Sequence, residues 1–331
     1  MLRHGDIVST RAVQSTGLAD FDFESYSEAG YDWLDAEQKW ASTGSKASPG
    51  IAAVGTAVYA AHPSTEVLSL AYDLKDGLGA RLWTPGMEPP KDLFAHLASG
   101  KLLEAHNSFF EFCIWNYVCH ARMGWPVLDY RQLRCSAAKA KAWSLPAALI
   151  KGGEALRLPV LKDEAGGKRV IQRYCIPRKP TAKDNGKRIR PEEEFAGLDL
   201  YVYNIQDIVA EAALSQATPD LSPDEQEMWL IDQRINIRGV QIDIPTVEVM
   251  TRILDDGLVH NDRSLVAVTS GALVTASEVS KMQDFLHSIG VHLDALDEEA
   301  VTEALKHHTV GLAYEVLRIR QASASAGVKK L

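Results

Sequence analysis

The first regular pattern in the chain is an alternation of apolar and acidic residues over positions 18–25, which read LADFDFES. In an extended segment Phe21 and Phe23 share one face, while the acids Asp22 and Glu24 share the other. This alternation predicts a β-strand that carries two carboxylates on a single face.

Runs with two different periods follow this strand. Short β-rich runs alternate with runs whose apolar residues recur every three or four positions, as is typical of helices. The predicted strands are residues 51–61, 66–74, 80–85 and 101–105. The predicted helices are residues 90–98, 107–122, 137–142, 145–156 and 198–214. The alternation favours a mixed α/β domain.

Beyond the turn-rich stretch SQATPDLSP at 215–223, the pattern is helical. The helices predicted there are residues 224–237, 246–270, 277–288, 298–306 and 313–323. We therefore expect an α/β domain over residues 15–216 and a smaller, all-helical segment over residues 222–331.

Composition narrows the class of protein. The 331 residues are 46% hydrophobic, and 35 Lys and Arg against 44 Asp and Glu give a net charge of −9. Such a chain is not a general polyanion binder, although a local basic patch can still contact nucleic acid. Four cysteines without C-x-x-C spacing exclude a disulfide scaffold and a zinc ribbon. The sequence has no apolar run long enough for a membrane helix and no signal-peptide pattern, so we expect a cytoplasmic protein without a membrane partner.

One segment departs from the overall acidity. Residues 168–190 contain nine Lys or Arg residues and a single acid, Asp184. Pro177, Pro180 and Gly186 interrupt regular structure there, which predicts a mobile basic excursion. A solvated loop without a partner fits the same composition.

Three pairs of residues could bring oxygen ligands together. Each pair has the spacing that places both members on one face of a strand or a helix. The pairs are Asp22 with Glu24, Asn107 with Glu111, and Tyr203 with Asp207. Carboxylates held together away from water repel each other unless a cation neutralises them, and two divalent cations about 4 Å apart can hydrolyse phosphodiesters. Taken singly, each pair also fits an ordinary solvated face or an ion-paired acid.

The order of the three pairs resembles the DEDD exonuclease superfamily, in the tyrosine-type branch found in family A DNA polymerases. Asp22 and Glu24 match its D-x-E motif, and Tyr203 with Asp207 matches its Y-x-x-x-D motif. Val202 stands where the histidine-type branch has histidine.

The second motif of that family, N-x-x-[FY]-D, is matched by Asn107 to Glu111, with Glu in place of the usual Asp. Residues 229–243 and 315–331 also resemble the start of the polymerase domain and the base of the thumb in bacteriophage enzymes of family A. Polymerase palm and fingers motifs are absent from the sequence. We therefore expect no primer extension by this chain, and a polymerase domain either in cis or in trans.

The resemblance implies a ribonuclease H-like exonuclease fold with a mixed central sheet, and 3′→5′ removal of nucleotides from single-stranded or frayed DNA ends. It implies two Mg²⁺ or Mn²⁺ ions. Asp22, Glu24 and Asp207 would hold the first ion, with Asp22 bridging, and Glu111 would serve the second. Tyr203 would orient the attacking water.

The resemblance suggests contacts to the terminal nucleotide, and the local excess of basic residues suggests further contacts with DNA. The expected contacts to the terminal nucleotide are Phe23, His106 and Asn107. The expected contacts of the basic segment with DNA are Lys179, Lys183, Lys187 and Arg188. Two alternatives remain open: a catalytically weak scaffold that binds DNA or a polymerase partner, and an RNA-trimming 3′→5′ exoribonuclease. For a phage-encoded chain the expected compartment is the host cytoplasm.

Overall fold

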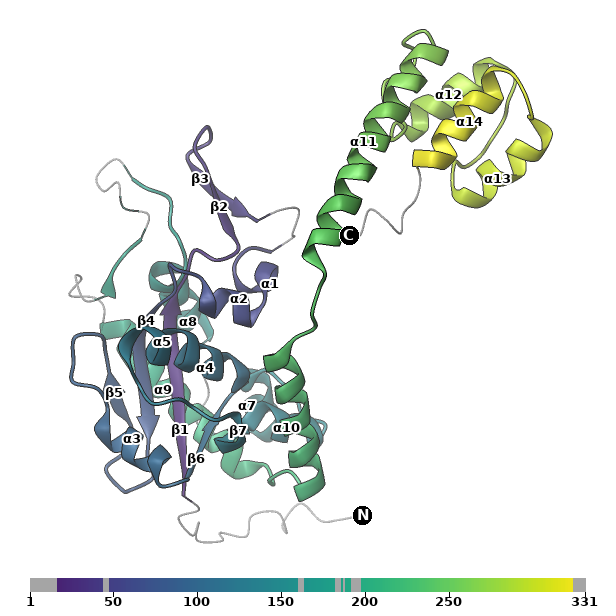
Figure 1. Ribbon diagram of the computed structural model, residues 1–331. Coiled ribbons are helices and arrows are strands. Elements are labelled where there is room, and N and C mark those ends of the chain that lie inside the picture. Colours follow the sequence, from purple (N-terminus) through teal and green to yellow (C-terminus); the bar gives the residue numbers. More distant parts are fainter. Residues whose placement is uncertain are drawn as a thin grey trace. The chain divides into compact units, whose positions relative to one another are not determined.

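The computed structural model describes residues 17–43, 48–159, 164–181, 186, 188–191 and 198–323. The chain divides into two compact units, Met1–Gly239 and Val240–Leu331. The first is an α/β unit and the second is helical in its described part (Figure 1). Among the described residues, no helix is long and apolar enough to cross a membrane.

The first unit is built on a five-stranded sheet in the order β5-β4-β1-β6-β7. The strands are β1 (Leu18–Tyr26), β4 (Glu66–Asp73), β5 (Arg81–Trp83), β6 (Leu102–Ala105) and β7 (Leu133–Cys135). β1 is antiparallel to β4 and parallel to β6, and the β6–β7 pair is parallel too. The sheet is therefore mixed, as the family resemblance implied.

β1 is the central strand, and its two neighbours accompany it over different lengths. Its pairing with β4 runs from Asp20 to Tyr26, whereas its pairing with β6 covers Leu18 to Asp20. The carboxyl-terminal half of β1 thus extends beyond β6. Because a strand that outruns its neighbour leaves backbone N–H groups to be satisfied by other parts of the chain, side chains from helices can reach that edge.

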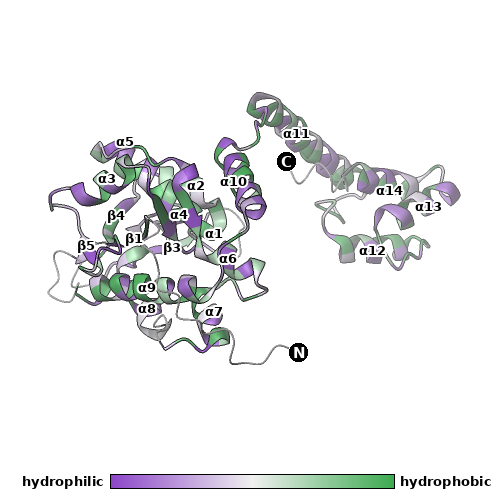
Figure 2. Cartoon of the chain, turned by 90° about the horizontal axis from the view of Figure 1, so that it is seen from below, coloured by the Kyte–Doolittle hydropathy of each residue, from purple (hydrophilic) through white to green (hydrophobic). Residues whose placement is uncertain are grey.

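Helices cover both faces of the sheet, and Figure 2 shows α8 and α9 on one face with α3, α4 and α5 on the other. The helices of this unit are α1 (Ile51–Val54), α2 (Thr56–Ala61), α3 (Lys91–Ala98), α4 (Phe109–Ile114), the π-helix η1 (Trp115–His120), α5 (Ala121–Met123), the 3₁₀-helix η2 (Tyr130–Gln132), α6 (Ser136–Ala142), α7 (Leu149–Leu156), α8 (Glu164–Val170), the π-helix η3 (Ile171–Cys175), α9 (Leu198–Ala217) and α10 (Pro223–Arg238).

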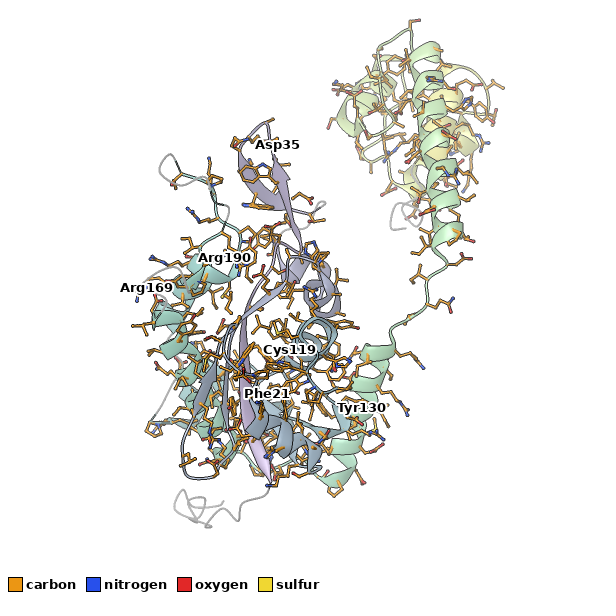
Figure 3. The ribbon with its side chains drawn as sticks, turned by 60° about the vertical axis from the view of Figure 1, so that its left-hand side comes forward. Phe21, Asp35, Cys119, Tyr130, Arg169 and Arg190 are labelled. Atoms are coloured by element: carbon orange, nitrogen blue, oxygen red, sulfur yellow. The ribbon has the colours of Figure 1, made fainter. Side chains whose placement is uncertain are left out.

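The main core lies between the sheet and α4–η1. Phe21 and Phe23 contact Trp115 edge-on at centroid distances of 6.2 and 6.3 Å. Figure 3 shows Phe21 and Cys119 inside this unit, with Arg169 and Arg190 at its periphery. The two phenylalanines of the predicted strand therefore face the core, on the side opposite to the acids.

Three parts of the first unit differ from the expectation. Residues 51–61 form α1 and α2, not strands, because a short apolar run rich in alanine fits either element and Tyr59 packs against Phe110 of α4. The hairpin of β2 (Tyr31–Leu34) and β3 (Lys39–Ser42) was not predicted. The short strand β7 was also missed.

The basic segment is more regular than its composition suggested. α8 and η3 continue through Cys175, so residues 168–175 are helical. Val170 and Tyr174 are buried in a cluster with Leu200 and Tyr203 of α9. Apolar burial against α9 therefore overrides the charge of this stretch. Lys183 and Lys187 lie outside the described residues.

The second unit has its own core and is helical in its described part. Its helices are α11 (Ile244–Val268), α12 (Val279–Ser288), α13 (Glu298–His307) and α14 (Leu312–Ser323). Leu265, Met282 and Leu317 are fully buried there. The units divide at Gly239, later than the expected boundary between 216 and 222, because Trp229 of α10 packs against the core of the first unit.

Candidate active site

An acidic cluster lies between β1 and α9. Asp22 and Glu24 come from β1 and Asp207 comes from α9, and one carboxylate oxygen from each residue lies within 4.8 Å of the others. Asp22 is half-buried, whereas Glu24 and Asp207 are buried. Three carboxylates at this separation are a hard, anionic donor set of the kind that divalent cations prefer.

The local structure explains how the three acids meet. β1 alternates its side chains, so Asp22 and Glu24 point away from Phe21 and Phe23 towards α9. α9 packs against β1 and β4 through a face that includes Leu200, Asn204, Asp207 and Ile208 (Figure 1). The Asp207 carboxylate is thus fixed by helix packing, and the other two by the strand.

Asn204 is a site residue that sequence reasoning missed. Its amide nitrogen donates to Asp22 Oδ2 at 2.7 Å and to the Asp22 carbonyl oxygen at 3.2 Å. Its amide oxygen accepts a hydrogen bond from the Ser69 hydroxyl at 2.9 Å, which fixes the orientation of the amide. Asn204 is fully buried and therefore holds the Asp22 carboxylate in place. The only signal in the sequence was its position directly after Tyr203.

Glu111 reaches the same strand from the other side of the sheet. Its Oε2 accepts a hydrogen bond of 2.9 Å from the backbone N–H of Phe23, between the two acids of β1. Glu111 is buried, but it does not belong to the cluster in which all ligand atoms lie within 4.8 Å. The carboxylate of Glu111 is thus hydrogen-bonded to the part of β1 that extends beyond β6. Its role as a ligand of a second metal ion stays a prediction.

Tyr203 lies one helical turn before Asp207 and is almost fully buried. Its ring packs in the cluster that contains Tyr174 and Leu200. The backbone of α8 approaches the ring so closely at Gly167 that a Cβ there would lie 2.4 Å from Tyr203 Cε2. Glycine at this position is therefore what allows α8 to cover the tyrosine.

A buried thiol also contacts the cluster. Cys175 Sγ lies 3.5 Å from Glu24 Oε2 and donates to it. Burial, followed by the charge of Glu24, raises the pKa of this thiol well above its ordinary value. The protonated thiol is therefore a hydrogen-bond donor that orients Glu24.

The expected nucleotide contacts have different outcomes. Phe23 is 3% exposed and its ring packs with Trp115 and Trp125, so any contact of this residue with a nucleotide is left to its backbone and stays a prediction. Alternation on β1 places it in the core, opposite to the acids. Asn107 is exposed and has a positive φ of 67° at the turn before α4. His106 is half-buried, and its ring nitrogens contact the Ser136 hydroxyl at 2.9 Å and the Ala147 carbonyl at 2.7 Å.

Within the basic segment, Lys179 is exposed, whereas the Arg188 side chain contacts residues of the sheet. Arg188 pairs with Glu66 at 2.6 Å, and its guanidinium lies 4.2 Å from the centroid of the Tyr26 ring. Arg190 pairs with the same Glu66 at 3.3 Å. The two arginines therefore hold the end of this segment against β1 and β4.

Other buried acids lie on the same side of the sheet as the cluster. Asp20 pairs with Lys75, and burial raises the pKa of Asp20 to about 6 although the lysine opposes this. Glu211 of α9 accepts a hydrogen bond from Ser136 at 3.3 Å, and burial raises its pKa well above the ordinary value, with neighbouring acids adding to the effect. The pairing of Asp20 with lysine separates it from the acids that could bind a cation.

Two comparisons with known proteins bear on this arrangement. No protein-family profile matches the chain. The chain is similar in sequence to a DNA polymerase of Bacillus phage SP02, with 30% identity over 286 residues, which are 83% of this chain and 42% of the polymerase. The chain thus spans less than half the length of this relative.

Proposed function

We propose that this chain is a metal-dependent 3′→5′ exonuclease that removes nucleotides from single-stranded or frayed DNA ends. The observation that carries the proposal is the cluster of Asp22, Glu24 and Asp207, at positions that match the exonuclease motifs. The similarity to a phage DNA polymerase supports DNA as the substrate and a polymerase domain, in cis or in trans, as the partner. A host-cytoplasm location would follow from the same similarity.

The fold supports the same proposal. A ribonuclease H-like domain has a mixed sheet with helices on both faces, and the order β5-β4-β1-β6-β7 with antiparallel β4 is compatible with it. The acids lie on the central strand and on a helix that crosses it. The proposed reaction would therefore take place at the middle of the sheet.

The residues have distinct parts in the proposed reaction. Asp22, Glu24 and Asp207 would hold divalent cations, with Asp22 shared, and Glu111 would serve a second cation from the edge of β1. Bound Mg²⁺ or Mn²⁺ supplies a water of lowered pKa and neutralises charge on the leaving oxygen. Asn204 and Cys175 keep two of the carboxylates oriented. Tyr203 would hold the attacking water through its hydroxyl.

Hydrolysis of a 5′-labelled, single-stranded oligonucleotide tests this proposal. With Mg²⁺ or Mn²⁺ the chain should shorten the strand from its 3′ end. Asp22→Asn, Glu24→Gln and Asp207→Asn should each lower the single-turnover rate by roughly 10²-fold or more, because each replaces a charged ligand by a neutral group of the same size. Glu88→Gln, which removes an exposed charge, is the matched control.

Parent activity that survives all three substitutions contradicts the assignment. Labelled DNA and RNA of the same sequence, assayed side by side, decide between a deoxyribonuclease and the RNA-trimming alternative. Metal dependence of the parent is checked by adding EDTA and then excess Mg²⁺.

A second candidate function is favoured by Glu111. Because this carboxylate is bonded to the Phe23 N–H and lies outside the cluster, the site could hold fewer metal ions than an efficient nuclease needs. The chain would then be a catalytically weak scaffold for DNA or a polymerase. Calorimetric titration with Mg²⁺ and Mn²⁺ separates the two functions, because the scaffold predicts weak metal binding together with strand binding.

A further inference from the structure

A cavity of about 610 Å³ lies between the α8–η3 segment and α9, the helix that carries Asp207 of the acidic cluster. Tyr203 and Gln206 line it, and they belong to the helical turn that leads to Asp207. One helical turn rises about 5.4 Å, so along the axis of α9 these two lining residues lie within about one turn of Asp207.

The lining of this cavity is cationic in a protein whose net charge is −9. Arg169 and Arg173 lie four positions apart and contribute two guanidinium groups, and Asp199 is the single acid in the described lining. Arg169 is exposed on the outer side of the unit (Figure 3). Arginine donates two parallel hydrogen bonds to a phosphate and keeps its charge at any physiological pH.

The remaining lining suits a sugar–phosphate chain better than a base. Gln172 and Gln206 offer amides, and Val170 and Val202 offer small apolar surfaces. Tyr203, the one aromatic residue in the described lining, is 5% exposed and already packed, so it has no open face for a base to stack on. A site of this type reads the backbone and not the sequence.

We infer that this cavity binds the backbone of the strand next to the bond that is cut, with Arg169 and Arg173 each contacting a phosphate. The inference rests on the proposed exonuclease function, because that function brings a strand to the cluster. Neither arginine is among the basic residues that the sequence predicted to contact DNA, such as Lys179 and Arg188.

Binding of a 5′-labelled oligo-dT in EDTA tests this inference apart from hydrolysis, because EDTA removes the metal ions that cutting needs. Arg169→Gln/Arg173→Gln should weaken binding roughly tenfold and lower the slope of log K against log salt by about 1.4, or 0.7 per lost phosphate contact. Arg169→Lys/Arg173→Lys should keep most of the slope. The charge-matched control is Lys91→Gln/Lys151→Gln, two exposed lysines on other helices.

A neutral methylphosphonate, placed at one linkage at a time near the 3′ end, locates the contact. At the contacted linkage it should weaken binding to the parent and have little further effect on the Gln pair, because the interaction has already been lost. Equal urea midpoints for all proteins check that loss of Arg173, which lies 5.4 Å from the Tyr174 ring, leaves the fold intact.

The outcomes separate this inference from the proposed function. If the Gln pair binds oligo-dT as tightly and with the same salt slope as the lysine control, the inference is overturned even when the parent cuts DNA. If the arginines govern binding but no metal supports cutting, the inference stands and the exonuclease proposal fails. Thymidine 5′-monophosphate is the competing source of phosphate: if the arginines control its binding but not that of oligo-dT, the strand contact is refuted.

Discussion

At the scale of single residues, Glu111 has one observed contact and one proposed role. It accepts a hydrogen bond from the Phe23 N–H at the edge of β1, and the proposed function gives it a second metal ion. Replacement by alanine would remove both, since a buried N–H left without an acceptor costs about 1–3 kcal/mol. A substitution that keeps the acceptor is needed to tell the two uses apart.

Glu111→Gln keeps an oxygen for the Phe23 N–H and removes the charge. If the charge serves a metal, Glu111→Gln should lower single-turnover hydrolysis by at least roughly tenfold with an unchanged melting temperature, whereas Glu111→Ala should lower both. Glu111→Asp should retain activity, since it restores the usual ligand of the family. Parent-like hydrolysis by Glu111→Gln would remove Glu111 from the metal site and leave it a structural residue.

Glu211 gives a pH-dependent prediction, because burial raises its pKa above the ordinary value of 4.5. Above that pH the unfolded chain releases a proton that the folded chain retains, so this group lowers the free energy of unfolding as pH rises. Glu211→Gln should therefore gain stability relative to the parent between pH 5 and pH 8, by up to about 1.4 kcal/mol per pH unit. Urea unfolding at both pH values measures the difference, with the exposed Glu154→Gln as control. A difference that stays constant between the two pH values would contradict a raised pKa.

At the scale of elements, the close contact of α8 with α9 depends on one residue without a side chain. α8 covers Tyr203 at Gly167, where a Cβ would meet the ring at 2.4 Å. Elsewhere a helical glycine weakens its helix, by about 1 kcal/mol relative to alanine. The contact with Tyr203 therefore reverses the ordinary preference at this position.

Gly167→Ala should lower the stability of the first unit and displace α8 from Tyr203, with loss of hydrolysis. Gly257→Ala, in α11, should be neutral or stabilising because nothing lies within 4 Å of its added Cβ. Thermal unfolding and single-turnover hydrolysis of the two variants make the comparison. If Gly167→Ala were as stable and as active as the parent, α8 would not be held against the tyrosine.

At the scale of the whole molecule, the boundary between the units lies after α10. Trp229 packs against the main core, and Gln233 of the same helix is buried. α10 begins with a capping box in which Ser222 and Glu225 bond each other's backbone N–H groups. This helix therefore belongs to the stability of the α/β unit.

Two fragments test where the first unit ends. Residues 1–239 should unfold in urea as cooperatively as the full chain and keep its hydrolysis of single strands. Residues 1–221 should be less stable by about 2 kcal/mol or more, because this fragment lacks Trp229 and so leaves part of the main core uncovered. If the two fragments had equal urea midpoints of unfolding, the first unit would end in the loop at 215–223 and not after α10.

The sequence by itself determined much of the order of the elements and singled out the acids. Alternation defined β1, helical periodicity defined α9, and the spacings of Asp22 with Glu24 and of Tyr203 with Asp207 singled out the three acids that the fold brings together. These features are local, because a period of two or of 3.6 residues is set by the backbone alone.

Only the tertiary structure decided which face and which partner each residue has. It placed Phe23 in the core, made Asn204 the support of Asp22, bonded Glu111 to β1 and folded α8 over Tyr203. Residues 51–61 became helical because an apolar run without a clear period takes the element that its neighbours accommodate. Each of these outcomes depends on contacts between segments far apart in the chain, and no local pattern encodes such contacts.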